Sequence, residues 1–66
     1  MRETALRDLI RDSGMSPEAI AASLRISRVT LNEKINGRSD FKVSEVKKLQ
    51  KALGLTDKQV LSIFFS

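Results

Sequence analysis

The sequence predicts a single all-α domain built from five short helices. Three observations indicate this. Apolar residues recur at three- and four-residue spacings instead of alternating, Ser or Thr precedes several of these segments, and Gly follows their ends. The chain has 66 residues, which suits one small domain with one core. It contains no Cys and no His, so apolar packing and helix capping must stabilise it without disulfides or the usual transition-metal ligands.

The first two helices are predicted at residues 4–12 and 17–24. In the first, the apolar residues fall on one face, and Gly14 can take the left-handed conformation that ends a helix. The second begins at Ser16, whose hydroxyl can accept a hydrogen bond from the first turn. Pro17 then occupies the first helical position, where its missing N–H costs nothing.

The third helix is predicted at residues 28–36, with Ser27 as its cap. Only two residues separate the last apolar residue of the second helix from Ser27, so these helices must cross at a large angle, as in a helix-turn-helix unit. The fourth helix is predicted at residues 43–53, where the apolar residues again share one face. The fifth, at residues 57–65, begins after Thr56.

We expect all five helices to contribute to the core. In the fifth, Val60, Leu61 and Phe64 are expected to face inward, which leaves Ile63 and Phe65 partly exposed. These two residues either pack against the first helix or the chain end, or they form a two-fold dimer contact. We favour the dimer contact. The other expected core residues are Leu6, Leu9, Ile10, Met15, Ile20, Ala21, Leu24, Ile26, Leu31, Ile35, Phe41, Val46, Leu49 and Leu53.

Positive charge is concentrated in one part of the chain. The whole sequence has a formal net charge of +4, from twelve Lys and Arg against eight Asp and Glu. Between Arg25 and Lys51 there are eight basic and three acidic residues, so this segment alone carries +5. Such a segment is typical of proteins that bind a polyanion, although a basic run can also be an ordinary solvated face.

The segment SPEAIAASLRISRVTLNEKINGRSDF, residues 16–41, resembles the helix-turn-helix of the Cro/CI-type (lambda repressor-like, XRE) regulators. The matches SEV at residues 44–46, and LT and IFF within residues 55–65, are similar to small phage and prophage members. The resemblance covers nearly the whole chain. It implies a compact five-helix fold and a repressor-like regulator of transcription that binds double-stranded DNA, with the third helix in the major groove.

The resemblance also implies which residues meet the DNA. Arg28 suits a bidentate contact with guanine, and Asn32 one with adenine. Val29 suits a thymine methyl group, and Glu33 either a cytosine amino group or a role in orienting a neighbouring cation. Without the resemblance, the same side chains would be an ordinary solvated helix face. The implied backbone contacts are Ser16, Arg25, Ser27, Thr30, Lys34, Arg38, Ser39 and Lys42.

Two positions depart from the family pattern. Arg25 stands where the family usually has Gly, and a left-handed backbone there would cost about 1 kcal/mol relative to Gly. Pro17 stands where the family often has a Gln that touches phosphate and braces the first residue of the third helix. We therefore expect either a looser contact on that side or a brace from Glu18.

The function class has one rival. A protein-interaction module of antitoxin or anti-repressor type could use the same fold without binding DNA, since fold alone does not determine function. An enzyme is not expected, because the sequence has no metal-ligand cluster, no Gly-rich phosphate loop and no suitably placed carboxylate pair.

The expected partners are a double-stranded DNA operator and a second copy of the chain, which would make the operator palindromic. No cofactor and no small-molecule ligand are expected. No apolar run approaches the roughly 18 residues that cross a bilayer, and the first residues, MRETALRDL, lack the features of a signal peptide. We therefore expect a cytoplasmic protein of a bacterial host cell.

Overall fold

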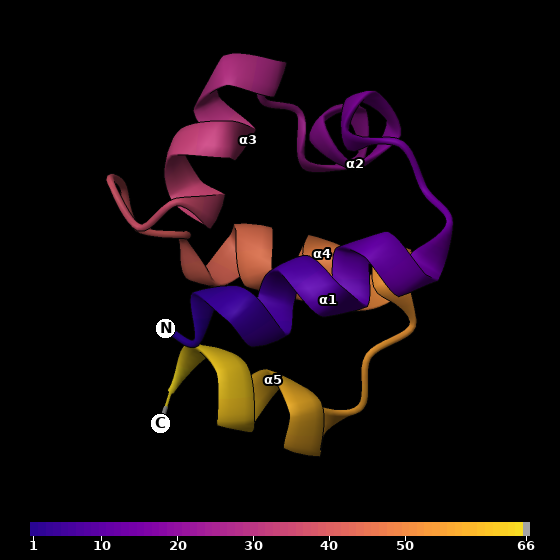
Figure 1. Ribbon diagram of the computed structural model, residues 1–66, viewed down its shortest axis with the longest axis vertical. Helices are drawn as coiled ribbons and strands as arrows, with labels where there is room; N and C mark the ends of the chain where they lie inside the picture. The colour runs from indigo at the N-terminus through magenta and orange to yellow at the C-terminus, as the bar shows by residue number, and fades with distance from the viewer. Residues whose placement is uncertain (66) are drawn as a thin grey trace.

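The computed structural model describes residues 1–65, and these contain five helices and no strand. The prediction of an all-α, five-helix fold is confirmed (Figure 1). The helices are α1 (Glu3–Ser13), α2 (Pro17–Leu24), α3 (Arg28–Ile35), α4 (Val43–Leu53) and α5 (Asp57–Phe64).

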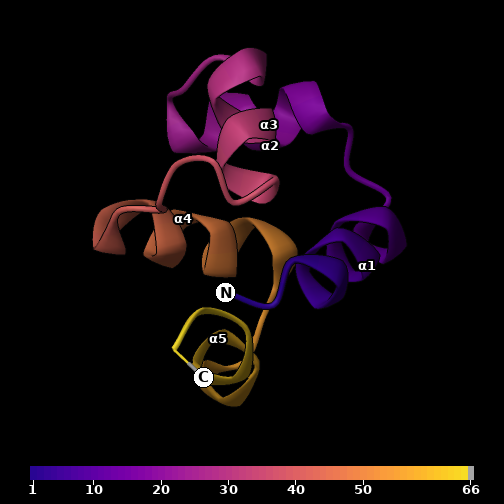
Figure 2. The same cartoon turned by 60° about the vertical axis from the view of Figure 1, so that its left-hand side comes forward.

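The helices are arranged in three levels, with α2 and α3 at one end of the molecule and α5 at the other (Figure 1). Between these ends lie α1 and α4, and Figure 2 shows the same order after a 60° turn. Helix α4 packs against α2, while α1 contacts α3, α4 and α5. As a result, α3 is held on its inner side and lies at the surface on its outer side.

The centre of the core is made by one residue from each of the first four helices. Leu6, Ile20, Leu31 and Leu49 are completely withdrawn from solvent, and Ile63 of α5 joins them with 3% of its surface exposed. A smaller cluster joins Val46 of α4, Leu55 of the following loop and Val60 of α5. The partly buried Leu9, Phe41, Leu53 and Phe64 pack against both clusters.

Helix α5 turns a different face to the core from the one expected. Leu61 is 59% exposed, and Ile63, expected to be partly exposed, is buried. The reason is helical phase: Val60, Ile63 and Phe64 form a stripe at i, i+3 and i+4, and Leu61 lies off it. The N–H of Arg2 also donates a hydrogen bond to the carbonyl of Ile63, which ties this face to the N-terminal segment. Ile63 is therefore a core residue and is not available as a dimer contact.

The predicted helix starts form as local chemistry requires. The hydroxyls of Ser16, Ser27 and Thr56 each accept a hydrogen bond from a backbone N–H three residues later, at 3.0–3.1 Å. The helix ends differ slightly from the predicted ranges. For example, α3 ends at Ile35 and not at Asn36, because the closing turn has already begun there.

Helix α2 closes with a left-handed residue that is not glycine. The N–H of Arg25 donates to the carbonyl of Ala22, and the N–H of Ile26 donates to that of Ala21, the paired bonds of a Schellman closure. Arg25 has φ 57° and is the one non-glycine residue with positive φ in the described chain. The strain anticipated from the sequence is therefore present in the turn that sets the angle between α2 and α3.

The cost of this turn can be measured with two opposite substitutions. Arg25→Gly should raise the free energy of unfolding by up to about 1 kcal/mol, because Gly adopts this conformation freely. Gly14→Ala should lower it by about the same amount: Gly14 has φ +73°, and an added Cβ would meet no atom within 4 Å, so backbone strain is the only new cost. Urea unfolding measures both. If Arg25→Gly proves destabilising, the Arg25 side chain makes a stabilising contact that outweighs the strain.

Candidate nucleic-acid interface

Helix α3 divides into a buried side and an exposed side. Leu31 and Lys34 are buried on the inner side, with Ile35 partly buried beside them. The outer side carries exposed residues at positions i, i+1, i+4 and i+5, which lie next to one another on a helix. We call these four residues the α3 stripe: Arg28, Val29, Asn32 and Glu33.

Within the α3 stripe, Arg28 is already oriented by another helix. One of its guanidinium nitrogens donates a hydrogen bond to the carboxylate of Glu18, in the first turn of α2. Both side chains are about half exposed or more, so the pair contributes little stability. Its effect is geometric, because it holds Arg28 at the entrance to α3 while other N–H groups of the guanidinium stay available. Glu18 thus supplies the brace that Pro17 cannot.

The hydroxyls at the helix starts are partly engaged within the protein. The Ser27 hydroxyl accepts from the Thr30 N–H and donates to the Thr30 hydroxyl at 2.9 Å, which leaves the Thr30 hydroxyl proton free of that bond. Ser16 uses its oxygen to cap α2, so its proton is not part of the cap. Among these hydroxyls, those of Ser16 and Thr30 are therefore better placed than Ser27 to donate to an anion.

Lys34 does not lie on the surface, contrary to the expectation that it contacts phosphate. Its side chain is 7% exposed, and its ammonium donates hydrogen bonds to the Glu45 carboxylate at 2.7 Å and to the Asp40 carbonyl at 2.9 Å. The ammonium also lies 5.9 Å from the centre of the Phe41 ring. The physical reason is that α3 turns this position toward α4, where a carboxylate is buried to receive the charge.

Glu45 was not identified as a site residue from the sequence. Its carboxylate accepts from Lys34 and also from the backbone N–H of Lys42 at 2.8 Å, so it caps the start of α4. Lys42 has no acceptor with which to return this bond, so only half of a capping box forms. The available signal was Glu at the third position of a helix that lacks an N-cap side chain.

The loop between α3 and α4 displays the other predicted backbone contacts. Arg38 and Lys42 are exposed, and Ser39 is partly exposed. The start of the loop is fastened to α1, because Arg7 donates a hydrogen bond to the Asn36 side chain. Gly37 has φ +77°, a conformation that favours glycine, and a Cβ there would also displace the flexible carboxylate of Glu3. The structure brings these residues together beside the C-terminal end of α3.

A second cationic surface lies between α2 and α4. Arg25, Lys48 and Lys51, with Ser23 and Ala52, line a shallow groove of about 530 Å³ that has no acidic residue in its lining. Lys48 and Lys51 belong to the basic segment found in the sequence but were not predicted as DNA contacts. Their signal was a spacing of three, which places them on one face of α4.

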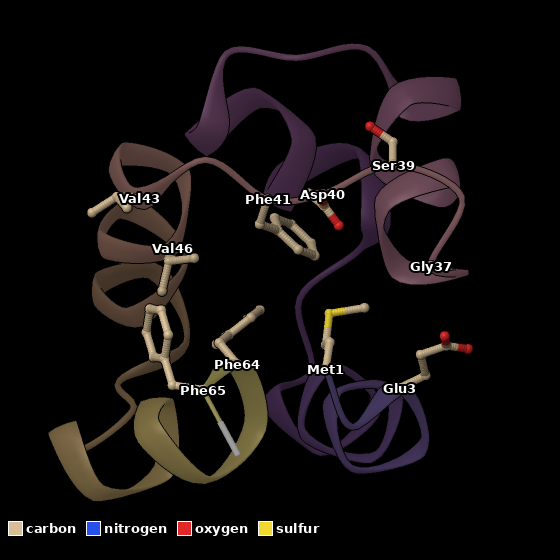
Figure 3. A pocket seen from close by; sticks show the side chains of 10 residues that line it. All are labelled: Met1, Glu3, Gly37, Ser39, Asp40, Phe41, Val43, Val46, Phe64 and Phe65. Carbon is tan, nitrogen blue, oxygen red and sulfur yellow. The ribbon is translucent and has the colours of Figure 1, made fainter.

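A pocket of different chemistry lies between the N-terminal segment, the α3–α4 loop, α4 and α5 (Figure 3). Its volume is about 400 Å³. Six of its ten lining residues are of apolar type, and its charged side chains are the carboxylates of Glu3 and Asp40. Since its lining has two carboxylates and no Lys or Arg side chain, this pocket differs in character from the basic surfaces.

Two further findings concern residues 1–65. They contain no group of three or more Asp, Glu, His or Cys side chains placed to hold a metal ion. None of their helices is long and apolar enough to cross a membrane.

Comparison with known families gives one result. The family model described as Helix-turn-helix matches residues 6–60, a range that begins in α1 and ends in α5. No curated protein and no solved structure gives a significant match.

The buried carboxylate predicts how stability depends on pH. Burial would raise the pKa of Glu45, but the hydrogen bonds from Lys34 and the Lys42 N–H, with the charges of both lysines, together lower it. The contribution of Glu45 to the free energy of unfolding is therefore fully present above the ordinary Glu pKa of about 4.3. It is lost as the pH falls through the lower pKa of the folded state. Glu45→Gln should therefore be less stable at neutral pH and should lose less stability in acid.

Urea unfolding at a series of pH values measures this dependence. Asp8→Asn, which removes an exposed carboxylate beside Arg11, is the control for the loss of one acidic group. An acid profile of Glu45→Gln identical to that of the unmodified protein would show that the pair does not supply this stability.

Proposed function

From its membership of the helix-turn-helix family of the Cro/CI (XRE) type, we propose that the chain reads a specific double-stranded DNA sequence with α3. This is a family of DNA-binding regulators that are generally not enzymes. In this proposal α3 lies in the major groove, as the second helix of such a unit does. The observation that carries it is the α3 stripe: four side chains held outward by a helix whose other side is buried.

Each member of the α3 stripe has chemistry that suits a base edge. Arg28, oriented by Glu18, offers the paired donors that guanine accepts, and Asn32 offers the donor and acceptor that match adenine. Val29 is 66% exposed, an unfavourable place for an apolar side chain unless it meets another apolar group such as a thymine methyl. Glu33 can accept from a cytosine amino group.

Contacts with the DNA backbone come in this proposal from around α3. Arg38, Ser39 and Lys42 extend from the α3–α4 loop, and the hydroxyls of Ser16 and Thr30 lie at helix starts, where backbone N–H groups also favour anions. Ser27 contributes through its backbone, and Arg25 through the cationic groove it shares with Lys48 and Lys51. Such contacts give affinity that falls with salt and do not read sequence.

We further propose that two copies pair through an apolar patch, defined as Met1, Val43 and Phe65 at the pocket of Figure 3 together with Leu61, one helical turn before Phe65. Each of these side chains is at least 42% exposed, and together they are four of the five large exposed apolar residues in the described chain. Phe65 is the C-cap of α5, and its N–H donates a hydrogen bond to the carbonyl of Leu61. Exposed apolar residues gathered in this way are typical of an interaction surface. A two-fold pair would suit a palindromic operator, and occupying it would make the protein a repressor of the phage or prophage type.

Substitutions in the α3 stripe test the base-reading role. After an operator has been selected from random duplex DNA, Arg28→Ala should cost about 1–3 kcal/mol of binding free energy and relax selectivity at one base pair. Lys58→Ala removes an exposed cation on α5 and is the matched control, with selectivity unchanged. Fluorescence anisotropy with a labelled duplex at several salt concentrations measures both.

Two outcomes would count against DNA reading. One is affinity for duplex DNA that does not fall steeply with salt. The other is affinity unchanged in the double variant Arg28→Ala with Asn32→Ala. Either would favour the protein-interaction module.

Pairing is tested by placing a charge in the apolar patch. Phe65→Asp should shift sedimentation equilibrium toward the monomer and reduce binding to a palindromic duplex more than to a single half-site. Ala22→Asp introduces the same charge at an exposed position of α2, at the opposite end of the molecule from α5, and is the control for sedimentation (Figure 1). An unmodified protein that stays monomeric and binds half-site and palindrome equally would rule out the pairing.

A further inference from the structure

The buried ion pair connects three consecutive parts of the chain: α3, the loop after it and α4. Lys34 extends from α3, Glu45 from the first turn of α4, and both bind the loop that joins these helices. The Lys34 ammonium donates to the Asp40 carbonyl at 2.9 Å, and the Glu45 carboxylate accepts from the Lys42 N–H at 2.8 Å. The pair therefore holds the later part of the loop by its backbone at two points, two residues apart.

Burying this pair is not explained by stability alone. Taking an ammonium and a carboxylate out of water is costly, and apolar side chains of similar size commonly stabilise such a site as well or better. Here 93% of the Lys34 side chain and 91% of the Glu45 side chain are withdrawn from solvent. What apolar side chains could not reproduce is the pair of hydrogen bonds to Asp40 and Lys42, because these need a donor and an acceptor.

The segment held in this way displays candidate phosphate contacts. Ser39 precedes the held Asp40 carbonyl, and Lys42 carries the held N–H. Arg38 lies at the turn that closes α3. Phe41 between them is directed inward and meets Phe64 edge-on, with ring centroids 5.5 Å apart. An unfastened loop would keep its cations but would have to order them on each binding event, and that ordering reduces affinity.

We propose that Lys34 and Glu45 are positioning residues for DNA binding, which hold the α3–α4 loop so that Arg38, Ser39 and Lys42 meet the DNA backbone together. This inference rests on the proposed function. It assigns a role in affinity to two residues that do not themselves touch DNA.

The test compares two variants that separate charge from hydrogen bonding. The double variant Lys34→Met with Glu45→Met removes both loop hydrogen bonds and keeps side chains of similar length. It should fold with a melting temperature close to or above that of the unmodified protein. Its affinity for the selected duplex should nevertheless fall about tenfold, and the slope of log affinity against log salt should become shallower by about 0.9 for each phosphate that the loop no longer neutralises. The amide of Lys42 should exchange with solvent faster.

Glu45→Gln is the opposite case. It keeps an acceptor for the Lys42 N–H while removing the charge, so it should be less stable but should bind DNA with nearly the unmodified affinity and salt slope. A purely structural role would instead make affinity follow stability in both variants. Arg28→Ala is a further control, because it should weaken binding without changing exchange of the Lys42 amide.

Several outcomes would overturn the inference. One is a folded double-Met variant with unchanged affinity and salt slope. If that variant does not fold, hydrogen exchange of the Lys42 amide is measured in the unmodified protein without DNA. Exchange as fast as in an unfolded chain would show that the loop is not held. Failure of the unmodified protein to bind any duplex is a separate result, which removes the proposed function itself.

Discussion

Every helix of this domain depends on a core that no helix could form alone. The helices have eight or eleven residues, and isolated helices of this length are not stable in water. Leu6, Ile20, Leu31 and Leu49 come from four different helices and exclude water only by meeting one another. The direction in which α3 displays its outer side is thus a property of the whole domain, set by this contact.

The shared core explains how α3 can pack against the other helices with so few buried apolar residues. Leu31 is its one fully buried apolar side chain, and Lys34 occupies a second inward position. A lysine can be tolerated there because Glu45 and the Asp40 carbonyl satisfy its ammonium. The arrangement leaves the outer surface of the helix polar except at Val29, and it links the end of α3 to the start of α4 through the intervening loop.

Local features of the fold were predictable, and those that depend on neighbours were not. Ser16, Ser27 and Thr56 cap helices through bonds that span three residues, so the sequence alone was sufficient to find them. The exposure of the α3 stripe followed from helical spacing and from the family resemblance. Lys34 was misplaced because nothing in its own segment shows that a carboxylate eleven residues later is buried opposite it. Leu61 was predicted to be buried and Ile63 to be partly exposed, and the structure shows the reverse. Because α5 is apolar on more than one face, only its packing partners determine which face is buried.

By itself, then, the sequence determined the five helices, the caps of three of them, the tight turn between α2 and α3 and the family to which they belong. These follow from short-range hydrogen bonding, from apolar spacing and from motif residues close together in the chain. The tertiary structure decided which cations remain on the surface and which apolar side chains are left without a partner. Those outcomes depend on the burial of each side chain among groups distant in sequence, and for Lys34 on a hydrogen-bonded carboxylate that only folding brings within 2.7 Å.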